Sequence, residues 1–123
     1  MTTILLVDDD PLRAVVRKSI LEKRFANVLR AADAAEALCL VEEPKLSGEL
    51  SLVVSGLNLP GIGGPAFVSE LHSRLPAVPV LVLGGVGEAP TDYAGQPVEF
   101  LPRPTTADEL LAAAGKLLGQ TGR

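Results

Sequence analysis

Short apolar runs alternate with longer segments of helical periodicity along the chain. The runs lie at Thr3–Val7, Asn27–Ala31, Ser51–Ser55, Pro79–Leu83 and Val98–Leu101. Continuous apolar character over four or five residues is typical of strands that are buried on both faces of a parallel sheet. The pattern therefore predicts five strands separated by helices, with both faces of the sheet covered.

The first helical segment begins at Asp10, a suitable N-cap, and has Pro11 at its first position, where a missing N–H costs nothing. The helical spacing of its aliphatic residues predicts a buried stripe. We expect this stripe to consist of Leu12, Val15, Val16 and Ile20.

Two later helices are predicted to begin at capping boxes, formed by Asp33 with Glu36 and by Thr106 with Glu109. Residues 84–97, between the fourth and fifth strands, contain two prolines and several glycines. Both residue types oppose a regular helix. We therefore expect the fourth helix of the fold to be short or absent.

These features predict one α/β domain over residues 1–123, with a flavodoxin-like, doubly wound, five-stranded parallel sheet of order 2-1-3-4-5. The net charge of −4 argues against nucleic-acid binding through a basic surface. The sequence shows neither a secretory leader nor an apolar stretch that could cross a bilayer. We therefore expect a cytoplasmic protein that does not bind membranes.

Candidate functional residues gather at the carboxyl ends of the predicted strands, the edge where open α/β sheets bind ligands. They are Asp8 and Asp9 after the first strand, Gly56 after the third, Gly84 after the fourth and Arg103 after the fifth. The glycine-rich stretches at residues 61–64 and 84–87 match neither the dinucleotide fingerprint nor the P-loop. With no nucleophile and no oxyanion donor in view, we do not expect an enzyme.

This order of strands and edge residues resembles the receiver domain of two-component response regulators over nearly all of the chain. The resemblance rests on Asp8-Asp9-Asp10, Ser55-Gly56-Leu57-Asn58-Leu59-Pro60-Gly61, Gly84-Gly85 and Arg103-Pro104. It implies a site where an acidic pair holds Mg²⁺ and an aspartate after the third strand accepts a phosphoryl group. A hydroxyl residue and a lysine then contact that group.

Position by position, Asp8 and Asp9 match the acidic pair, and Asn58 matches the residue that gives a backbone carbonyl to the metal. Pro60 matches the proline four residues after the acceptor, which puts Gly56 at the acceptor position. Glycine has no carboxylate, so no acyl phosphate can form there. We expect Mg²⁺ binding to be weak or lost, and we expect no other cofactor.

Two more positions of the phosphorylation site that the resemblance implies depart from the family pattern, and a third position matches it. Gly84 replaces the hydroxyl residue, Arg103-Pro104 replaces Lys-Pro, and Phe100 matches the aromatic position whose rotamer often follows activation. Neighbouring carboxylates repel unless a charge neutralises them, and a guanidinium can bind a carboxylate bidentately. Arg103 either pairs with the acidic pair in this way or lies in solvent.

The first helix carries three arginines that are predicted to fall on one outward line, with a leucine beside them. These residues are Arg13, Arg17, Arg24 and Leu21. The resemblance implies that kinases and phosphotransfer domains dock on this helix. The four residues are therefore a possible partner face, and a solvated helix surface is the alternative.

The sequence favours one function and leaves two alternatives. The favoured function is a pseudo-receiver: a signalling module that binds a protein partner without being phosphorylated. The second is a phosphorelay receiver that uses an atypical acceptor. The third is a sensor that binds a small ligand at the carboxyl edge of the strands.

Overall fold

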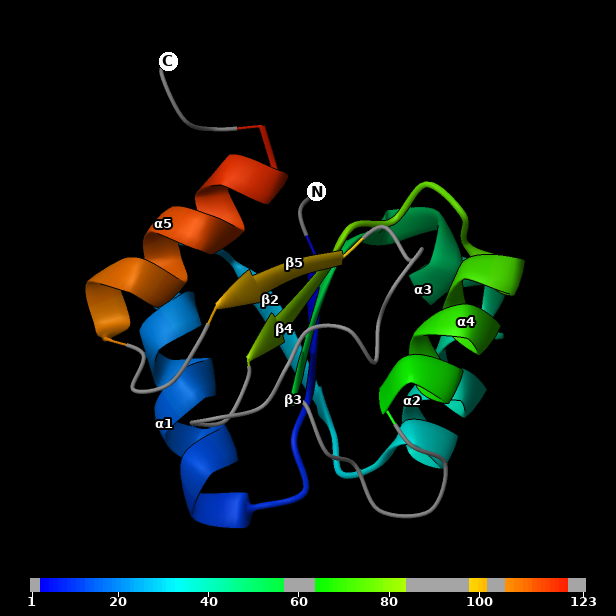
Figure 1. Ribbon diagram of the computed structural model, residues 1–123, viewed down its shortest axis with the longest axis horizontal. Helices are drawn as coiled ribbons and strands as arrows, with labels where there is room; N and C mark the ends of the chain where they lie inside the picture. The colour runs from blue at the N-terminus through cyan, green and yellow to red at the C-terminus, as the bar shows by residue number, and fades with distance from the viewer. Residues whose placement is uncertain (1–2, 57–63, 84–97, 102–105, 120–123) are drawn as a thin grey trace.

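The computed structural model describes residues 3–56, 64–83, 98–101 and 106–119, and within them five strands form one parallel sheet (Figure 1). The order β2-β1-β3-β4-β5 confirms the predicted doubly wound fold. The strands are β1 (Thr3–Val7), β2 (Asn27–Ala31), β3 (Leu50–Gly56), β4 (Val80–Leu83) and β5 (Val98–Leu101).

Helices cover both faces of the sheet (Figure 1). One face carries α1 (Pro11–Glu22) and α5 (Ala107–Leu117), which contact each other. The other face carries α2 (Ala34–Val41), α3 (Pro44–Glu49) and α4 (Gly64–Arg74). The short α3 was not predicted, although a proline at its first position favours a helix start.

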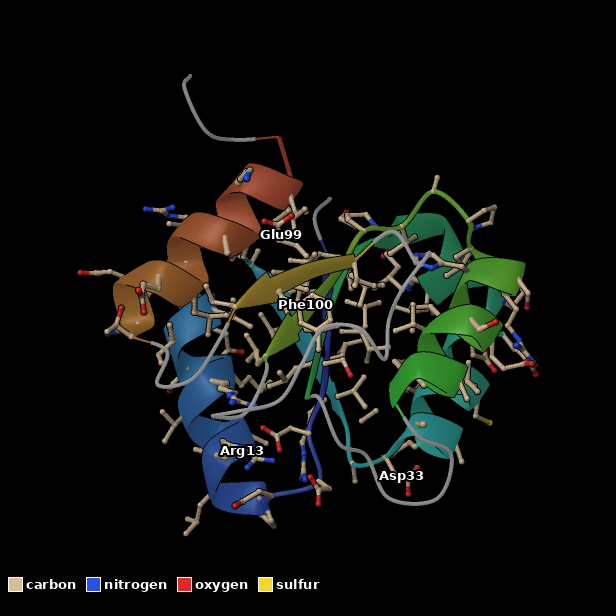
Figure 2. The ribbon with its side chains drawn as sticks, in the orientation of Figure 1. Arg13, Asp33, Glu99 and Phe100 are labelled. Atoms are coloured by element: carbon tan, nitrogen blue, oxygen red, sulfur yellow. The ribbon has the colours of Figure 1, made fainter. Side chains whose placement is uncertain are left out.

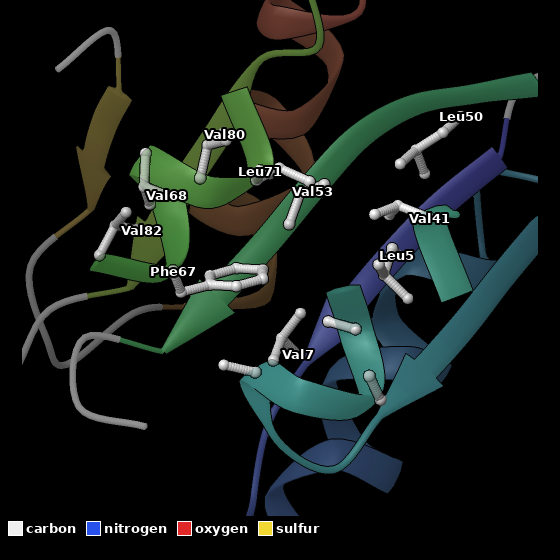
Figure 3. Close-up of a cluster of buried hydrophobic side chains, with 13 residues drawn as sticks. Leu5, Val7, Val41, Leu50, Val53, Phe67, Val68, Leu71, Val80 and Val82 are labelled. Atoms are coloured by element: carbon white, nitrogen blue, oxygen red, sulfur yellow. The ribbon is translucent and has the colours of Figure 1, made fainter. Parts of the chain in front are cut away.

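Alternating side chains of the central strands fill two cores, one on each side of the sheet. On β1, Leu5 and Val7 pack in a cluster that includes Phe67 of α4 (Figure 3). Ile4 and Leu6 point the other way, into the cluster beneath α1 and α5. Burying each such side chain stabilises the fold by roughly 1.5–3 kcal/mol. The strands are therefore fixed in register, and their carboxyl ends are held at one edge.

The helix starts follow the predicted capping chemistry, with one difference. At α5, the Thr106 hydroxyl accepts from the Glu109 amide at 3.1 Å, and the Glu109 carboxylate accepts from the Thr106 amide at 3.0 Å. At α2, Asp33 accepts from the Glu36 amide at 2.8 Å. The Glu36 carboxylate, however, accepts from the amide of Ala32, one residue before the expected partner.

The predicted buried stripe of α1 is wrong. Leu12, Val15 and Val16 are 80%, 65% and 57% exposed, and Ile20 is half-buried. The helix is rotated so that another set faces the sheet, namely Ala14, Arg17 and Leu21. The reason is electrostatic, because a buried aspartate at the end of β1 takes arginine partners from this helix.

The remaining fold predictions concern residues 84–97 and membrane-spanning segments. The helix expected to be short or absent between β4 and β5 falls on residues 84–97. These lie outside the described residues, so this expectation stays a prediction. None of the helices in the described part of the chain is long and apolar enough to cross a bilayer.

Candidate functional site

The parallel register brings the ends of β1 and β3 together. Val7 pairs with Ser55, so the next residue of each strand, Asp8 and Gly56, lies at the same edge. Gly56 is buried and also pairs with Leu83, the last residue of β4. The edge therefore holds a carboxylate at the end of β1 and no side chain at the end of β3.

The carboxylate of Asp8 is fully buried and surrounded by donors. Its Oδ1 accepts from Arg13 Nη2 at 2.8 Å and from the Asp10 amide at 3.0 Å. Its Oδ2 accepts from Arg17 Nη1 at 2.8 Å and from Arg13 Nε at 3.0 Å. Charge-assisted bonds of this length are among the stronger hydrogen bonds in proteins. Both oxygens of Asp8 are thus engaged by guanidinium groups.

The start of α1 places these arginines within reach of Asp8. Asp10 caps the helix, with Oδ1 accepting from the amides of Leu12 at 3.0 Å and Arg13 at 3.2 Å. Arg13 and Arg17 are four residues apart, which puts them on one face of a helix. Figure 2 shows Arg13 extending from α1 toward the sheet.

A third arginine reaches the same residue from the edge strand β2. Arg30 donates from Nε at 3.2 Å and from Nη2 at 2.9 Å to the backbone carbonyl of Asp8. We call Arg13, Arg17 and Arg30, together with Asp8, the arginine clamp. The clamp connects β1, α1 and β2 through one aspartate.

Asp9 takes little part in the clamp. Its side chain is 45% exposed, and its Oδ1 lies 3.3 Å from Arg13 Nη2. A half-exposed pair of this kind contributes at most about 1 kcal/mol, because water screens it. Asp9 is therefore the carboxylate of the pair that solvent reaches.

The charges of the clamp shift the pKa of its members. Burial raises the pKa of the Asp8 carboxyl, but the hydrogen bonds from Arg13 and the Asp10 amide, with the positive guanidinium charges, outweigh it. The net pKa lies below the usual value of 3.8. The hydrogen bond to Asp8 raises the pKa of Arg13 in turn. Asp8 is therefore an anion at neutral pH.

Comparison with known proteins gives the family. The sequence matches the family described as response regulator receiver domain over residues 4–114. The chain belongs to that family. It is therefore a receiver domain of two-component signalling, as the sequence predicted.

Curated relatives and solved structures agree with this assignment. The chain is 31% identical over 119 residues to the sensor kinase CckA of Brucella abortus, covering 94% of this chain and 12% of that protein. It is 30% identical over 121 residues to the C4-dicarboxylate transport transcriptional regulatory protein DctD of Pseudomonas aeruginosa, covering 95% and 25%. A receiver domain structure from Clostridium thermocellum has a TM-score of 0.86 at 25% identity, covering 98% and 96%.

The receiver domain thus corresponds to a small part of these two longer relatives. The chain spans 12% and 25% of their lengths. Receiver domains are generally signalling modules without enzymatic activity of their own, and the methylesterase or kinase activity in some relatives' names belongs to multidomain proteins.

The described residues at this edge do not fit the Mg²⁺ ion that the receiver family implies. Mg²⁺ is bound by an octahedral shell of oxygens, usually with one or two carboxylates. Both oxygens of Asp8 already accept from arginines, and Gly56 offers no carboxylate. Asp9 remains, with one oxygen near Arg13. Among the described residues, no group of three or more potential metal ligands comes together.

The predicted outward line of arginines on α1 is wrong. Arg17 and Leu21 are buried, and the side chain of Arg13 is 35% exposed and turned to Asp8. Arg24 is exposed. Helical spacing correctly placed Arg13 and Arg17 on one side of α1, whereas Arg24 follows the end of that helix. The spacing could not reveal that the buried carboxylate of Asp8 would turn the first two arginines inward.

Of the other predicted site residues, the structure describes Phe100 but not the rest. Asn58, Gly84, Arg103 and Pro104 lie outside the described residues, so the pairing proposed for Arg103 stays a prediction. Phe100 lies on β5, in register with Val82, and packs half-buried against the core beneath α2 and α4 (Figure 2).

Sequence reasoning missed the role of the clamp arginines. A signal was present, since arginines five and nine residues after Asp8 fall on one helical face that begins at its neighbour Asp10. Arg30 carried no comparable signal, because its proximity to Asp8 depends on the pairing of β2 with β1.

A small hollow adjoins the clamp between α1, the end of β4 and the start of α5. Its volume is about 210 Å³. It is lined by Arg13, Val16, Arg17, Ile20, Leu83, Thr106 and Leu110. Pockets for drug-sized ligands usually have volumes of roughly 300–1,000 Å³, so this hollow would hold a smaller molecule at most.

Proposed function

We propose that this receiver domain is a pseudo-receiver, a protein-interaction module whose signalling does not depend on aspartyl phosphorylation. One observation carries the proposal. The end of β3, beside Asp8 in the register of the sheet, is Gly56, and a residue without a carboxylate cannot form an acyl phosphate. The buried Asp8 supports it further, because its oxygens are bound to arginines rather than open to a phosphoryl site.

The partner proposed for this module is a signalling protein that docks on α1. Leu12, Val15 and Val16 form an exposed aliphatic face at spacings of three and four residues. Exposed apolar groups that cluster in this way are typical of interaction surfaces, and an amphipathic helix of a partner would cover such a face through its own apolar stripe.

A phosphorelay receiver with an atypical acceptor is the second candidate. Asp8 is saturated with donors and Asp10 caps α1, whereas the Asp9 side chain is 45% exposed, so Asp9 is the acceptor that we would propose in this case. The small-ligand sensor is weaker, because the hollow beside the clamp has a volume of only about 210 Å³.

Incubation with acetyl phosphate and Mg²⁺, followed by intact-mass measurement, separates these functions. We expect the wild-type chain to gain no phosphoryl group, while a family member with the acceptor aspartate is labelled under the same conditions. We also expect poor labelling of Gly56→Asp, because the arginine clamp still occupies Asp8. A labelled wild-type chain would contradict the proposal, and loss of that label in Asp9→Asn would identify the atypical acceptor.

A further inference from the structure

We propose that Arg13 and Arg17 take the place of the divalent cation at Asp8, so that this receiver domain carries its counter-ion within its own chain. The inference goes beyond the proposed function, since it concerns the cation and holds whichever partner binds. It predicts that the acidic edge of this domain stays neutralised in the absence of Mg²⁺.

The geometry at Asp8 leaves no open coordination position. A carboxylate offers about four lone-pair positions. Those of Asp8 face Arg13 Nη2 and Nε, Arg17 Nη1 and the amide of Asp10, at 2.8 to 3.1 Å. A cation that approached either oxygen to the roughly 2.1 Å that Mg²⁺ requires would have to displace a guanidinium.

Burial makes this displacement unfavourable. The side chain of Asp8 is fully buried and that of Arg17 is only 11% exposed. A buried charge that loses its partner is strongly destabilising, and Arg17 would be left without its Asp8 contact if a cation took it. A cation at Asp8 would also find fewer ligands, because Gly56 supplies no carboxylate to bind it.

The same contacts determine which side of α1 meets solvent. Arg13 and Arg17 turn to Asp8, and the rotation that this requires leaves Leu12, Val15 and Val16 on the outer side. A cation-bound site would have no need of these arginines. The built-in counter-ion thus holds α1 in one orientation without any ion from solution.

Mn²⁺ is a suitable probe, because it broadens the amide NMR signals of residues near its binding site. Spectra are recorded during Mn²⁺ titration at constant ionic strength for the wild type and for the double variant Arg13→Gln, Arg17→Gln. Arg74→Gln is the matched control, because Arg74 pairs at the surface with Glu42 and Glu70, away from the edge. Competition with Mg²⁺ then tests whether the broadening reports a shared divalent site.

In the double variant we expect the signals of residues 8–10 to broaden at Mn²⁺ concentrations lower by about tenfold or more than in the wild type, with recovery on addition of Mg²⁺. Arg74→Gln should behave as the wild type does. If the double variant does not fold, Arg13→Gln alone keeps the Arg17 pair and should show the same direction of change. The inference is overturned if the wild type broadens at residues 8–10 as readily as the folded variant.

Discussion

We propose that Asp8 has a structural role in this domain rather than a metal-binding one. Its place after β1 is that of a metal-binding acid in the family, yet its carboxylate accepts from arginines on α1 and its carbonyl accepts from Arg30 on β2. A single buried side chain therefore connects three elements. We expect it to contribute more to stability than to ion binding.

The pH dependence of unfolding tests this role of Asp8. Its folded-state pKa lies below the unfolded value of about 3.9. The stabilisation is therefore fully present above that value and is lost as the pH falls through the folded-state pKa. At pH 7, Asp8→Asn should lower the free energy of unfolding by about 3–5 kcal/mol, because it removes one partner of a buried ion pair.

Urea unfolding between pH 7 and pH 3 provides the measurement. The difference between the wild type and Asp8→Asn should narrow toward the acid end, since only the wild type titrates at this position. Asp9→Asn is the matched control, and its effect should stay below about 1 kcal/mol because its pair with Arg13 is half-exposed. Equal stability of Asp8→Asn and the wild type at pH 7 would contradict the assigned role.

For single residues, the sequence predicted their places at the strand ends better than their side-chain contacts. The strand-end locations of Asp8 and Gly56 followed from local apolar runs, and the sheet register agrees with them. The partners of Asp8 could not be predicted in the same way, since a guanidinium can reach a carboxylate from several elements. Which arginines do so depends on how β1, α1 and β2 pack.

The helix α1 shows how a charge can override hydrophobic periodicity. Its apolar residues at positions 12, 15, 16 and 20 have the spacing of a buried stripe, yet the first three are exposed. Small Ala14 and long Leu21 face the core instead, with Arg17 between them on the same side. Pairing Asp8 inside the protein evidently outweighs burying Leu12 and two valines, since a buried unpaired carboxylate would be far more costly.

Substitutions on the two faces of α1 should therefore change the free energy of unfolding by very different amounts. We expect Val15→Lys to change the free energy of unfolding by less than about 0.5 kcal/mol, as for other surface positions. Leu21→Ala should destabilise by about 2–5 kcal/mol, because it leaves a cavity in the core beneath α1 and α5. Urea unfolding of both variants makes the comparison, and a large loss from Val15→Lys would show that the valine is buried in solution.

The Val15→Lys variant also tests whether a partner docks on α1. A photo-crosslinking residue at position 15 would capture the partner in cells, and the identified partner can then be titrated with the wild type and Val15→Lys. We expect the lysine to weaken binding, whereas Leu29→Lys, at an exposed leucine on the edge strand β2, should bind as the wild type does. Equal binding by all three would place the partner on another surface.

Local signals predicted the element boundaries well. The caps at Asp10, Asp33 and Thr106 begin α1, α2 and α5, because capping depends on residues next to each other in sequence. The short α3 was missed, since a helix of six residues shows too little periodicity to be detected.

At the scale of the whole molecule, we propose a domain that has the receiver fold but not a working phosphorylation site. Two cores on either side of the sheet hold the strand ends where a phosphorylation site would be assembled. The described part of that edge contains a glycine at the end of β3 and a neutralised aspartate at the end of β1. We therefore propose that the domain keeps one conformation without phosphorylation.

Amide NMR spectra recorded with and without beryllofluoride and Mg²⁺ test this claim most directly, because beryllofluoride mimics a bound phosphoryl group. We predict superimposable spectra for the wild type, with at most small local changes near Asp9. Widespread shifts that extended from the strand ends into β4, β5 and α5 would contradict it, since they would show that the site still receives a phosphoryl mimic and passes the change through the domain.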